Sequence, residues 1–371
     1  MGLSFHDAGM SAPATARTPA TVRGAALANF AQVAGEVGLN PRKALRDAGL
    51  DWEVLSDPDR RVSAESVAAL LERAARDSGC ETFGLRMAEQ RRLSDFGAVS
   101  LLIAHQPTLR DALETTVRYR HLLNEALAMH VEEAGDVFIL REELILPDGG
   151  AVRQACELAI GAMFRMLSSL LGPRWRPYSV RFAHPAPVDL AVHRRVFGAE
   201  LHFDSDFNGF VCPLADLDRI NPAADPAMAL YAKRYVDGLG RPRPDALSLE
   251  VRRAAHLLLP VGRGSIAQIA KWLGMNVRTL QRRLEAEGHD FSRLLNEVRR
   301  ELAMRYLANP ALSMAEVSRL LGYGQPSSFS RWFAAEFGCP PTDHITRASL
   351  ADGSEQDPAH AIRRRAAMSA A

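Results

Sequence analysis

Apolar residues recur three or four positions apart through most of the first 170 residues of the chain. This spacing puts the apolar side chains on one face of a helix, so it predicts amphipathic helices that pack against a common core. The segments that carry the pattern are residues 28–37, 41–48, 64–78, 109–122 and 151–171.

A second pattern, in which apolar and β-branched residues alternate with polar ones, interrupts these helices. Residues 126–132 and 136–143 show it on either side of Glu133-Ala134-Gly135, which predicts a β-hairpin. Three shorter strands and one short helix are expected further on, at residues 178–182, 200–203, 209–212 and 190–197. Helices and strands mixed in this way predict one α+β domain that extends to about residue 217.

Beyond this domain the strand pattern disappears. A predicted helix at residues 226–236 is followed by Asp237-Gly-Leu-Gly-Arg-Pro-Arg-Pro-Asp245, where two Gly and two Pro in nine residues indicate a linker. The segment 247–347 then contains only short helical patterns. The expected fold class is therefore multidomain, with an α+β domain first and an all-α domain second.

The all-α segment contains an internal repeat of a helix, a glycine and a second helix. Residues 265–288 form the first copy and residues 313–338 the second. Each copy opens on a capping box, and each first helix ends at a glycine suited to a left-handed turn. The residues in these roles are Ser265, Gln268 and Gly274 in the first copy and Ser313, Glu316 and Gly322 in the second. The repeat predicts two helix-turn-helix units.

The second helix of each copy combines one apolar face with one polar face. The expected buried pairs are Leu280 with Leu284 and Phe329 with Phe333. The polar face carries residue types that read base edges in the major groove, where Arg pairs with guanine and Gln with adenine. The expected DNA contacts are Arg278, Thr279, Gln281 and Arg282 in the first copy, and Gln325, Ser327, Ser328, Ser330 and Arg331 in the second.

Residues 291–308 predict one amphipathic connector helix between the two copies. Such a connector fixes the spacing of the units, so that one chain could read two successive major grooves about 34 Å apart. Arg293, Arg299 and Arg300 on this helix are weaker candidates for contacts with DNA phosphates. The alternative for these arginines is a solvated helix surface.

Charge is unevenly distributed, although the whole chain carries 45 Lys and Arg against 44 Asp and Glu. Residues 251–350 hold 14 basic and 8 acidic side chains, a net charge of +6, whereas residues 1–250 have a net charge of −5. The basic excess coincides with the repeat and favours an anionic partner, which supports double-stranded DNA.

Further motifs lie within and beside the repeat. Ala303-Met-Arg-Tyr-Leu307 closes the connector, and Val317-Ser-Arg-Leu-Leu-Gly-Tyr323 leads into the second turn. Ser328-Phe-Ser-Arg-Trp-Phe333 then precedes Gly338-Cys-Pro-Pro341. Together with Arg278-Thr-Leu-Gln-Arg-Arg-Leu284, these motifs resemble the DNA-binding domain of the AraC/XylS family of bacterial transcription regulators.

The resemblance implies a transcription regulator that binds promoter DNA and, as most of the family are activators, RNA polymerase. Residues from about 25 to 215 resemble, more loosely, the arabinose-binding type of N-terminal domain found in ornithine-utilisation regulators. That likeness implies a small-molecule effector and self-association, with a homodimer through a long helix such as 151–171 or 226–236 as one option.

The chain is accordingly divided into five parts. These are a disordered leader at 1–24, an effector-sensing α+β domain at 25–236, a linker at 237–246, a DNA-binding domain of two helix-turn-helix units and a connector helix at 247–350, and a disordered tail at 351–371.

The sequence offers one candidate effector pocket. Arg118, Tyr119 and His121 near the end of one predicted helix face another helix that carries Arg165, and together they could line a pocket for a small anionic or aromatic metabolite. The alternative is a packed helix pair with solvated arginines.

Catalytic, metal and cofactor motifs are not found in the sequence, so an enzyme is not expected. The four cysteines are far apart, which argues against a zinc site and a disulfide framework. No apolar run is long enough for a membrane span, and the expected location is the cytoplasm. Adjacent carboxyl groups such as Glu142 and Glu143 are expected to point to opposite faces of a strand and to be solvated.

Two other classes of protein remain open from the sequence. One is a repressor or architectural DNA-binding protein that needs no effector. The other is an enzyme domain fused to a DNA-binding domain. An enzyme should show clustered titratable groups in a pocket, and a sensor should show an enclosed cavity with few polar groups.

Overall fold

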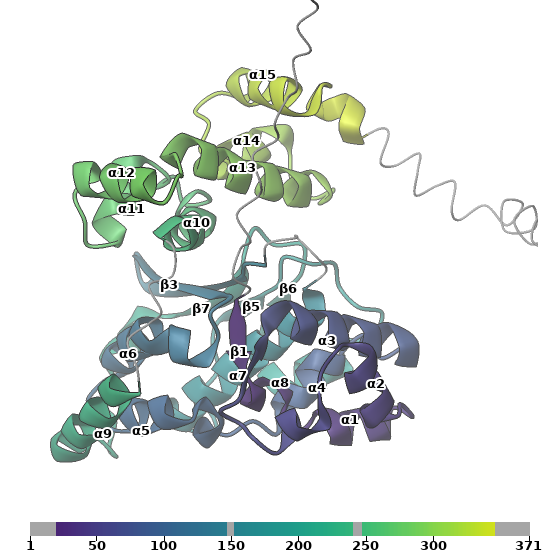
Figure 1. Ribbon diagram of the computed structural model, residues 1–371, viewed down its shortest axis with the longest axis vertical. Helices are drawn as coiled ribbons and strands as arrows, with labels where there is room; N and C mark the ends of the chain where they lie inside the picture. Colours follow the sequence, from purple (N-terminus) through teal and green to yellow (C-terminus); the bar gives the residue numbers. More distant parts are fainter. Residues whose placement is uncertain (1–19, 147–151, 240–246, 346–371) are drawn as a thin grey trace, which may run out of the picture.

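The chain folds into two domains (Figure 1), and each has its own hydrophobic core. The computed structural model describes residues 20–146, 152–239 and 247–345. Buried side chains from Ala20 to Val236 form the first core, and those from Leu247 to Phe333 form the second. The prediction of an α+β domain followed by an all-α domain is confirmed.

Helices make up most of the first domain. In α3 (Ala64–Ser78) the apolar stripe is buried and the Ser63 side chain caps the first turn by accepting a hydrogen bond from the Ser66 amide. The short helices at Phe83–Glu89 and Ala98–Ala104 were not predicted, because seven residues give little periodicity. The other helices are α1 (Phe30–Glu36), α2 (Pro41–Asp47), α4 (Phe83–Glu89), α5 (Ala98–Ala104), α6 (Leu109–Leu123), α7 (Arg153–Leu171), α8 (Ala191–Phe197) and α9 (Pro226–Gly238), with 3-10 turns η1 (Gly24–Leu27), η2 (Trp52–Leu55), η3 (Leu93–Phe96) and η4 (Leu214–Asp218).

A five-stranded sheet with the order β3-β4-β7-β5-β6 lies in the same domain. Only β5 and β6 run parallel, and the other neighbours are antiparallel. The predicted hairpin of β3 and β4 is confirmed, although β3 continues through Ala134 and shortens the expected loop. The strands are β3 (Leu127–Ala134), β4 (Val137–Leu144), β5 (Ser179–Arg181), β6 (Glu200–His202) and β7 (Asn208–Pro213).

The start of the first domain differs from the expected leader. Strand β1 (Thr21–Arg23) pairs with β2 (Arg61–Ser63), and the backbone amide and hydroxyl of Thr21 both donate to the Glu125 carboxylate at 2.7 Å. The leader predicted at 1–24 was therefore too long, because long-range strand pairing orders its last residues. Residues 1–19 and the predicted tail at 351–371 lie outside the described residues.

The predicted linker also begins later than expected. Helix α9 continues through Gly238, and the Tyr119 hydroxyl donates a 2.7 Å hydrogen bond to Asp237. This hydrogen bond holds the last turn of α9 against α6. The Gly and Pro residues nearby in the sequence give no sign of such a long-range contact. Residues 240–246 lie outside the described residues.

The second domain is all helical, as predicted. Helix α10 leads into two pairs of helices, and the long α13 lies between the pairs (Figure 1). The helices are α10 (Leu247–Leu258), α11 (Ile266–Trp272), α12 (Val277–Ala286), α13 (Phe291–Leu307), α14 (Met314–Leu320) and α15 (Pro326–Phe337).

The two domains meet where α10 lies over β3 (Figure 1), and where α10 and α13 both contact β4. Ala128 of β3 and Ile145, which directly follows β4, pack with Leu257 of α10. Polar contacts surround this apolar patch, and they include Arg305 to Glu143 at 2.8 Å, Arg120 to Glu250 at 2.7 Å, Asn309 to the Asp204 carbonyl at 2.7 Å and Arg253 to the Glu125 carbonyl. The all-α domain is thus docked on the sheet of the first domain.

Candidate nucleic-acid interface

Both predicted capping boxes are formed. The Ser265 hydroxyl accepts from the Gln268 amide at 3.3 Å, and the Gln268 side chain accepts from the Ser265 amide at 3.1 Å. Ser313 and Glu316 repeat this arrangement in α14. The hydrogen bonds from Ser313 lower the pKa of the Glu316 carboxyl, since they favour its charged form. Each first helix therefore begins at the predicted residue.

The two turns have the predicted glycine geometry. Gly274 has a φ of 67° and Gly322 a φ of 78°, both in the left-handed region that glycine adopts without strain. The recognition helices that follow begin differently. Asn276 caps α12 by accepting from the Thr279 amide at 2.8 Å, whereas α15 begins with Pro326. The Asn276 cap was missed, although Asn is a common cap residue.

The recognition helices α12 and α15 bury the predicted pairs. Leu280 and Leu284 of α12 are buried, as are Phe329 and Phe333 of α15. Ala270 and Ser318, on the preceding helices, are also buried. Each unit thus has one apolar face turned inward and leaves the opposite face of its recognition helix toward solvent.

Most of the predicted base-reading side chains lie on that outer face. Those that are exposed are Arg278, Gln281 and Arg282 on α12, and Gln325, Ser327 and Arg331 at the start and on the outer side of α15. Thr279, Ser328 and Ser330 are half-buried. The Ser330 hydroxyl donates to the Pro326 carbonyl at 3.1 Å, so it is already engaged within the helix.

The predicted phosphate contacts on α13 differ in their surroundings. Arg293 is exposed and pairs with Glu297 of the next turn at 3.5 Å, and exposed Arg300 pairs with Glu336 at 3.5 Å. Arg299 instead donates to the Leu321 carbonyl at 3.1 Å and lies over the Tyr323 ring. Arg299 therefore fixes the turn of the second unit to the connector, a role that its helical position alone did not reveal.

Three of the four predicted effector residues lie on one turn of α6, where the rings of Tyr119 and His121 are 6.4 Å apart, but Arg165 does not join them. Arg118 is exposed, the buried Tyr119 uses its hydroxyl on Asp237, and the His121 carbonyl accepts from Arg61. Arg165 donates to the Arg91 carbonyl at 3.3 Å and lines surface hollows that include none of the other three.

Glu142 and Glu143 of β4 point to opposite faces of the strand, as predicted, but they are not solvated. Glu142 is 3% exposed and Glu143 is 7% exposed. Burial raises the pKa of Glu142 to about 8, so its carboxyl is mostly protonated at neutral pH. Glu143 is bound by Arg305 from the second domain. The expectation of solvation was wrong because it treated the strand as isolated from the rest of the molecule.

Within the described ranges, no group of three or more His, Cys, Asp and Glu side chains could hold a metal ion. In the same parts of the chain, none of the helices combines the length and the apolar character that crossing a bilayer requires. Cys156 and Cys212 are buried, and burial raises the pKa of both thiols.

Two helix-turn-helix units with exposed Arg and Gln on their recognition helices, docked on an α+β domain, define a two-domain DNA-binding regulator. The family model described as the arabinose-binding domain of AraC transcription regulators matches residues 38–221, and a helix-turn-helix domain matches residues 269–347.

Similar proteins extend over both domains. The HTH-type transcriptional regulator VirS of Mycobacterium tuberculosis is 30% identical over 325 residues, which cover 87% of this chain and 96% of VirS. The ornithine utilization regulator of Pseudomonas aeruginosa is 26% identical over 311 residues, covering 82% of this chain and 90% of that protein. The crystal structure of the transcriptional regulator CdpR from P. aeruginosa has a TM-score of 0.40 and 22% identity, and covers 82% of this chain and 97% of its own. The chain belongs to the AraC family of transcription regulators.

Proposed function

We propose that this regulator senses a small-molecule effector with its first domain and activates transcription from promoter DNA that both helix-turn-helix units contact. The observation that carries the proposal is the matching design of α12 and α15. Each helix buries one apolar pair, and each exposes an arginine two residues after the first member of that pair, Arg282 and Arg331. One chain with two such helices is suited to two successive major grooves.

The surroundings of the two helices support the same arrangement on DNA. Residues 251–350 carry a net charge of +6, which attracts the phosphate backbone. Arg293 and Arg300 are exposed on α13 between the units and are the proposed phosphate contacts. Arg278, Thr279, Gln281, Gln325, Ser327 and Ser328 complete the proposed surface.

The Arg282→Ala variant is expected to weaken binding to the preferred duplex by about 10- to 100-fold, because a bidentate Arg–guanine contact contributes about 1–3 kcal/mol of discrimination. Preference should relax at one base position and persist at the others. The wild-type chain is first used to select a preferred duplex from a random pool. Fluorescence anisotropy then measures the affinity of both chains for versions of this duplex substituted at each position.

Arg283 supplies the matched control for this experiment. It is exposed on the same helix, but its guanidinium lies toward the turn, 3.9 Å from the sulfur of Met275. Arg283→Ala should therefore lower affinity only slightly and equally for all sequences. An equal loss of base preference in both variants would contradict the assignment of Arg282 as a base contact.

Activation requires that DNA-bound protein engage RNA polymerase. In vitro transcription with purified polymerase on a promoter that holds the selected duplex should give more transcript when the full chain is added. If the chain instead lowers the amount of transcript wherever the duplex is placed in the promoter, the protein is a repressor.

A second copy of this chain is the proposed partner of α9. Met228, Tyr231, Tyr235 and Leu239 form an exposed apolar stripe at helical spacing, with Tyr231 64% and Tyr235 57% exposed. Helix α9 lies at the end of the molecule away from α12 and α15, so pairing through it leaves both recognition helices free (Figure 1). Helix α7, the other long helix, is largely buried in the first core.

Replacing both Tyr231 and Tyr235 with Ser should convert a dimer to a monomer. Aromatic side chains at an interface often contribute about 2 kcal/mol each, so the dissociation constant should rise at least about 100-fold. Light scattering coupled to size-exclusion chromatography measures the mass, and Tyr178→Ser, an exposed tyrosine outside α9, is the control. A wild-type chain that is monomeric throughout the accessible concentration range would refute the dimer.

A further inference from the structure

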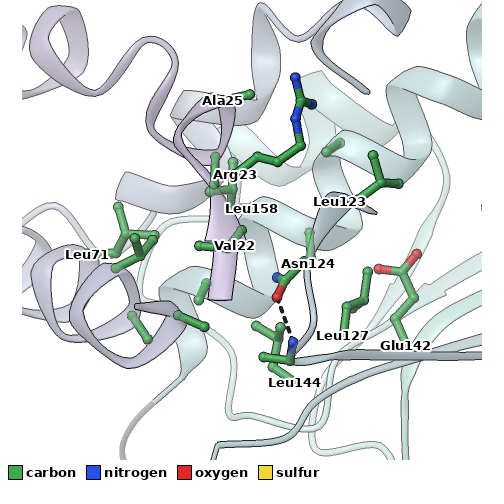
Figure 2. A pocket seen from close by; sticks show the side chains of 18 of the residues that line it. Val22, Arg23, Ala25, Leu71, Leu123, Asn124, Leu127, Glu142, Leu144 and Leu158 are labelled. Atoms are coloured by element: carbon green, nitrogen blue, oxygen red, sulfur yellow. Dashed lines mark hydrogen bonds between the residues drawn. The ribbon is translucent and has the colours of Figure 1, made fainter. Parts of the chain in front are cut away.

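A cavity of about 140 Å³ lies in the first domain between α3, α7 and the ends of β3 and β4 (Figure 2). Its walls are mostly aliphatic, with Val67, Leu71, Leu127, Leu144, Leu158 and Met163 among them. Apolar cavities of about 150 Å³ in other proteins remain dry and admit benzene. The cavity therefore has room for a ring-sized molecule.

One carboxyl group in this apolar wall lacks a hydrogen-bond partner. Both oxygens of Glu142 are buried and unpaired among the described residues. Figure 2 shows the Glu142 side chain beside Leu127 at one end of the cavity. Buried polar groups in native proteins are nearly always paired, and an unpaired one therefore needs an explanation such as a missing ligand.

Arg23, Arg91 and Asp95 also line the cavity, and each has partners in the protein, although the Nε atom of Arg91 is buried and unpaired among the described residues. The Asp95 carboxylate accepts from the Arg92 amide at 3.0 Å. Arg23 donates to the Asp59 carboxylate and to the Asp95 carbonyl at 2.9 Å. Both terminal nitrogens of Arg91 donate to backbone carbonyls, those of Ala25 and Ala26. Glu142 is the carboxyl that these contacts leave for a ligand.

We propose that this cavity is the effector site and that its ligand is a small, mainly apolar molecule with one N–H or O–H group that hydrogen-bonds with the carboxyl of Glu142. The inference rests on the proposed effector response, and it adds a location and a chemical class. Residues Arg118, Tyr119, His121 and Arg165 lie outside this cavity lining.

The position of Glu142 also connects the cavity to the DNA-binding domain. Neighbouring residues on a strand point to opposite faces, so Glu142 faces the cavity while Glu143 faces α13 and holds Arg305. The facing strand repeats this division, because Leu127 lines the cavity and Ala128 packs with Leu257 of α10. A ligand and the DNA-binding domain thus contact two faces of the same two strands, which provides a route for coupling.

Phenol and toluene test the site, because they have nearly the same shape and differ in one donor. Calorimetric titration of the full-length chain should give about tenfold tighter binding for phenol, since one net hydrogen bond corresponds to about that factor. The preference should persist in Glu142→Gln, which keeps an acceptor, and should disappear in Glu142→Leu. Benzylamine serves as a third probe, and its rank against phenol distinguishes a cationic from a neutral donor.

Three results would overturn the assignment of the cavity. The wild-type chain could bind phenol and toluene equally, the preference for phenol could survive in Glu142→Leu, or none of the probes could bind. Retained thermal stability of Glu142→Leu and Glu142→Gln shows that both variants are folded.

A second measurement distinguishes failure of the cavity as a ligand site from failure of the proposed effector response. Phenol should change the affinity of the full-length chain for its selected duplex at least twofold, and this change should be lost in Glu142→Leu. Selective binding of phenol with no change in DNA affinity for any probe would refute the coupling, whereas absence of binding would refute the site.

Discussion

Replacing Phe329 with Ala is expected to unfold the second helix-turn-helix unit and to abolish sequence-selective DNA binding. Phe329 is completely buried, and its ring lies 6.1 Å from the ring of Tyr323, 6.1 Å from that of Trp332 and 5.8 Å from that of Phe333. Removing a buried phenyl ring costs about 3–5 kcal/mol, since the remaining side chains cannot fill the cavity. Domains of this size are stable by only about 5–15 kcal/mol.

Urea unfolding followed by circular dichroism, together with anisotropy of labelled duplex, measures both consequences. Phe329→Leu keeps most of the apolar volume and should lose less than about 1.5 kcal/mol. The first domain has its own core, so its near-ultraviolet signal should persist in both variants. An unfolding midpoint for Phe329→Ala equal to that of the wild-type chain would show that this ring is not needed for the unit.

Replacing Arg305 with Ala is expected to release the DNA-binding domain from the sheet of the first domain. The arginine is 31% exposed, but the Glu143 carboxylate that it binds is largely buried. Glu143 would retain only a 3.5 Å hydrogen bond from the Asn208 side chain. Breaking a buried ion pair by removing one partner costs about 3–5 kcal/mol, and we expect a loss of about 3 kcal/mol in stability because Arg305 is partly solvated.

Scanning calorimetry should then resolve two transitions in place of one, because the domains lose the contact that joins their unfolding. Arg300→Ala is a matched control on the same helix, where the lost ion pair with Glu336 is at the surface and contributes less than about 1 kcal/mol. Exchanging the charges, with Arg305→Glu and Glu143→Arg together, should restore part of the coupling. A single unchanged transition in Arg305→Ala would show that apolar packing at Leu257 is sufficient for docking.

Sequence reasoning succeeded where structure is determined by neighbours along the chain. The helix starts at Ser265 and Ser313 and the turns at Gly274 and Gly322 each depend on interactions within a few residues. The outer faces of α12 and α15 then follow from helical periodicity. The helical scaffold of the candidate nucleic-acid interface was therefore predictable, apart from the cap at Asn276, whereas the contacts of Ser330 and Arg299 within the protein were not.

The first domain was harder to predict because its important contacts join distant segments. Thr21 is ordered through β2 and Glu125, about 40 and 104 positions further along. The environment of Glu143 depends on Arg305, 162 residues away. Local patterns could place the hairpin and its alternating faces, but they could not show that another domain would cover one face and a cavity would lie beside the other.

The unpaired carboxyl of Glu142 has a consequence for the lifetime of the protein in a cell. Burying an unsatisfied polar group lowers the stability of the empty form by about 1–3 kcal/mol, and a ligand that pairs with it removes that penalty. Ligand binding adds further stability by mass action, about 2.7 kcal/mol at a hundredfold excess over the dissociation constant. Differences of this size change the fraction of molecules open to proteolysis several-fold. The ligand concentration would then determine the amount of regulator in the cell as well as the DNA affinity of each copy.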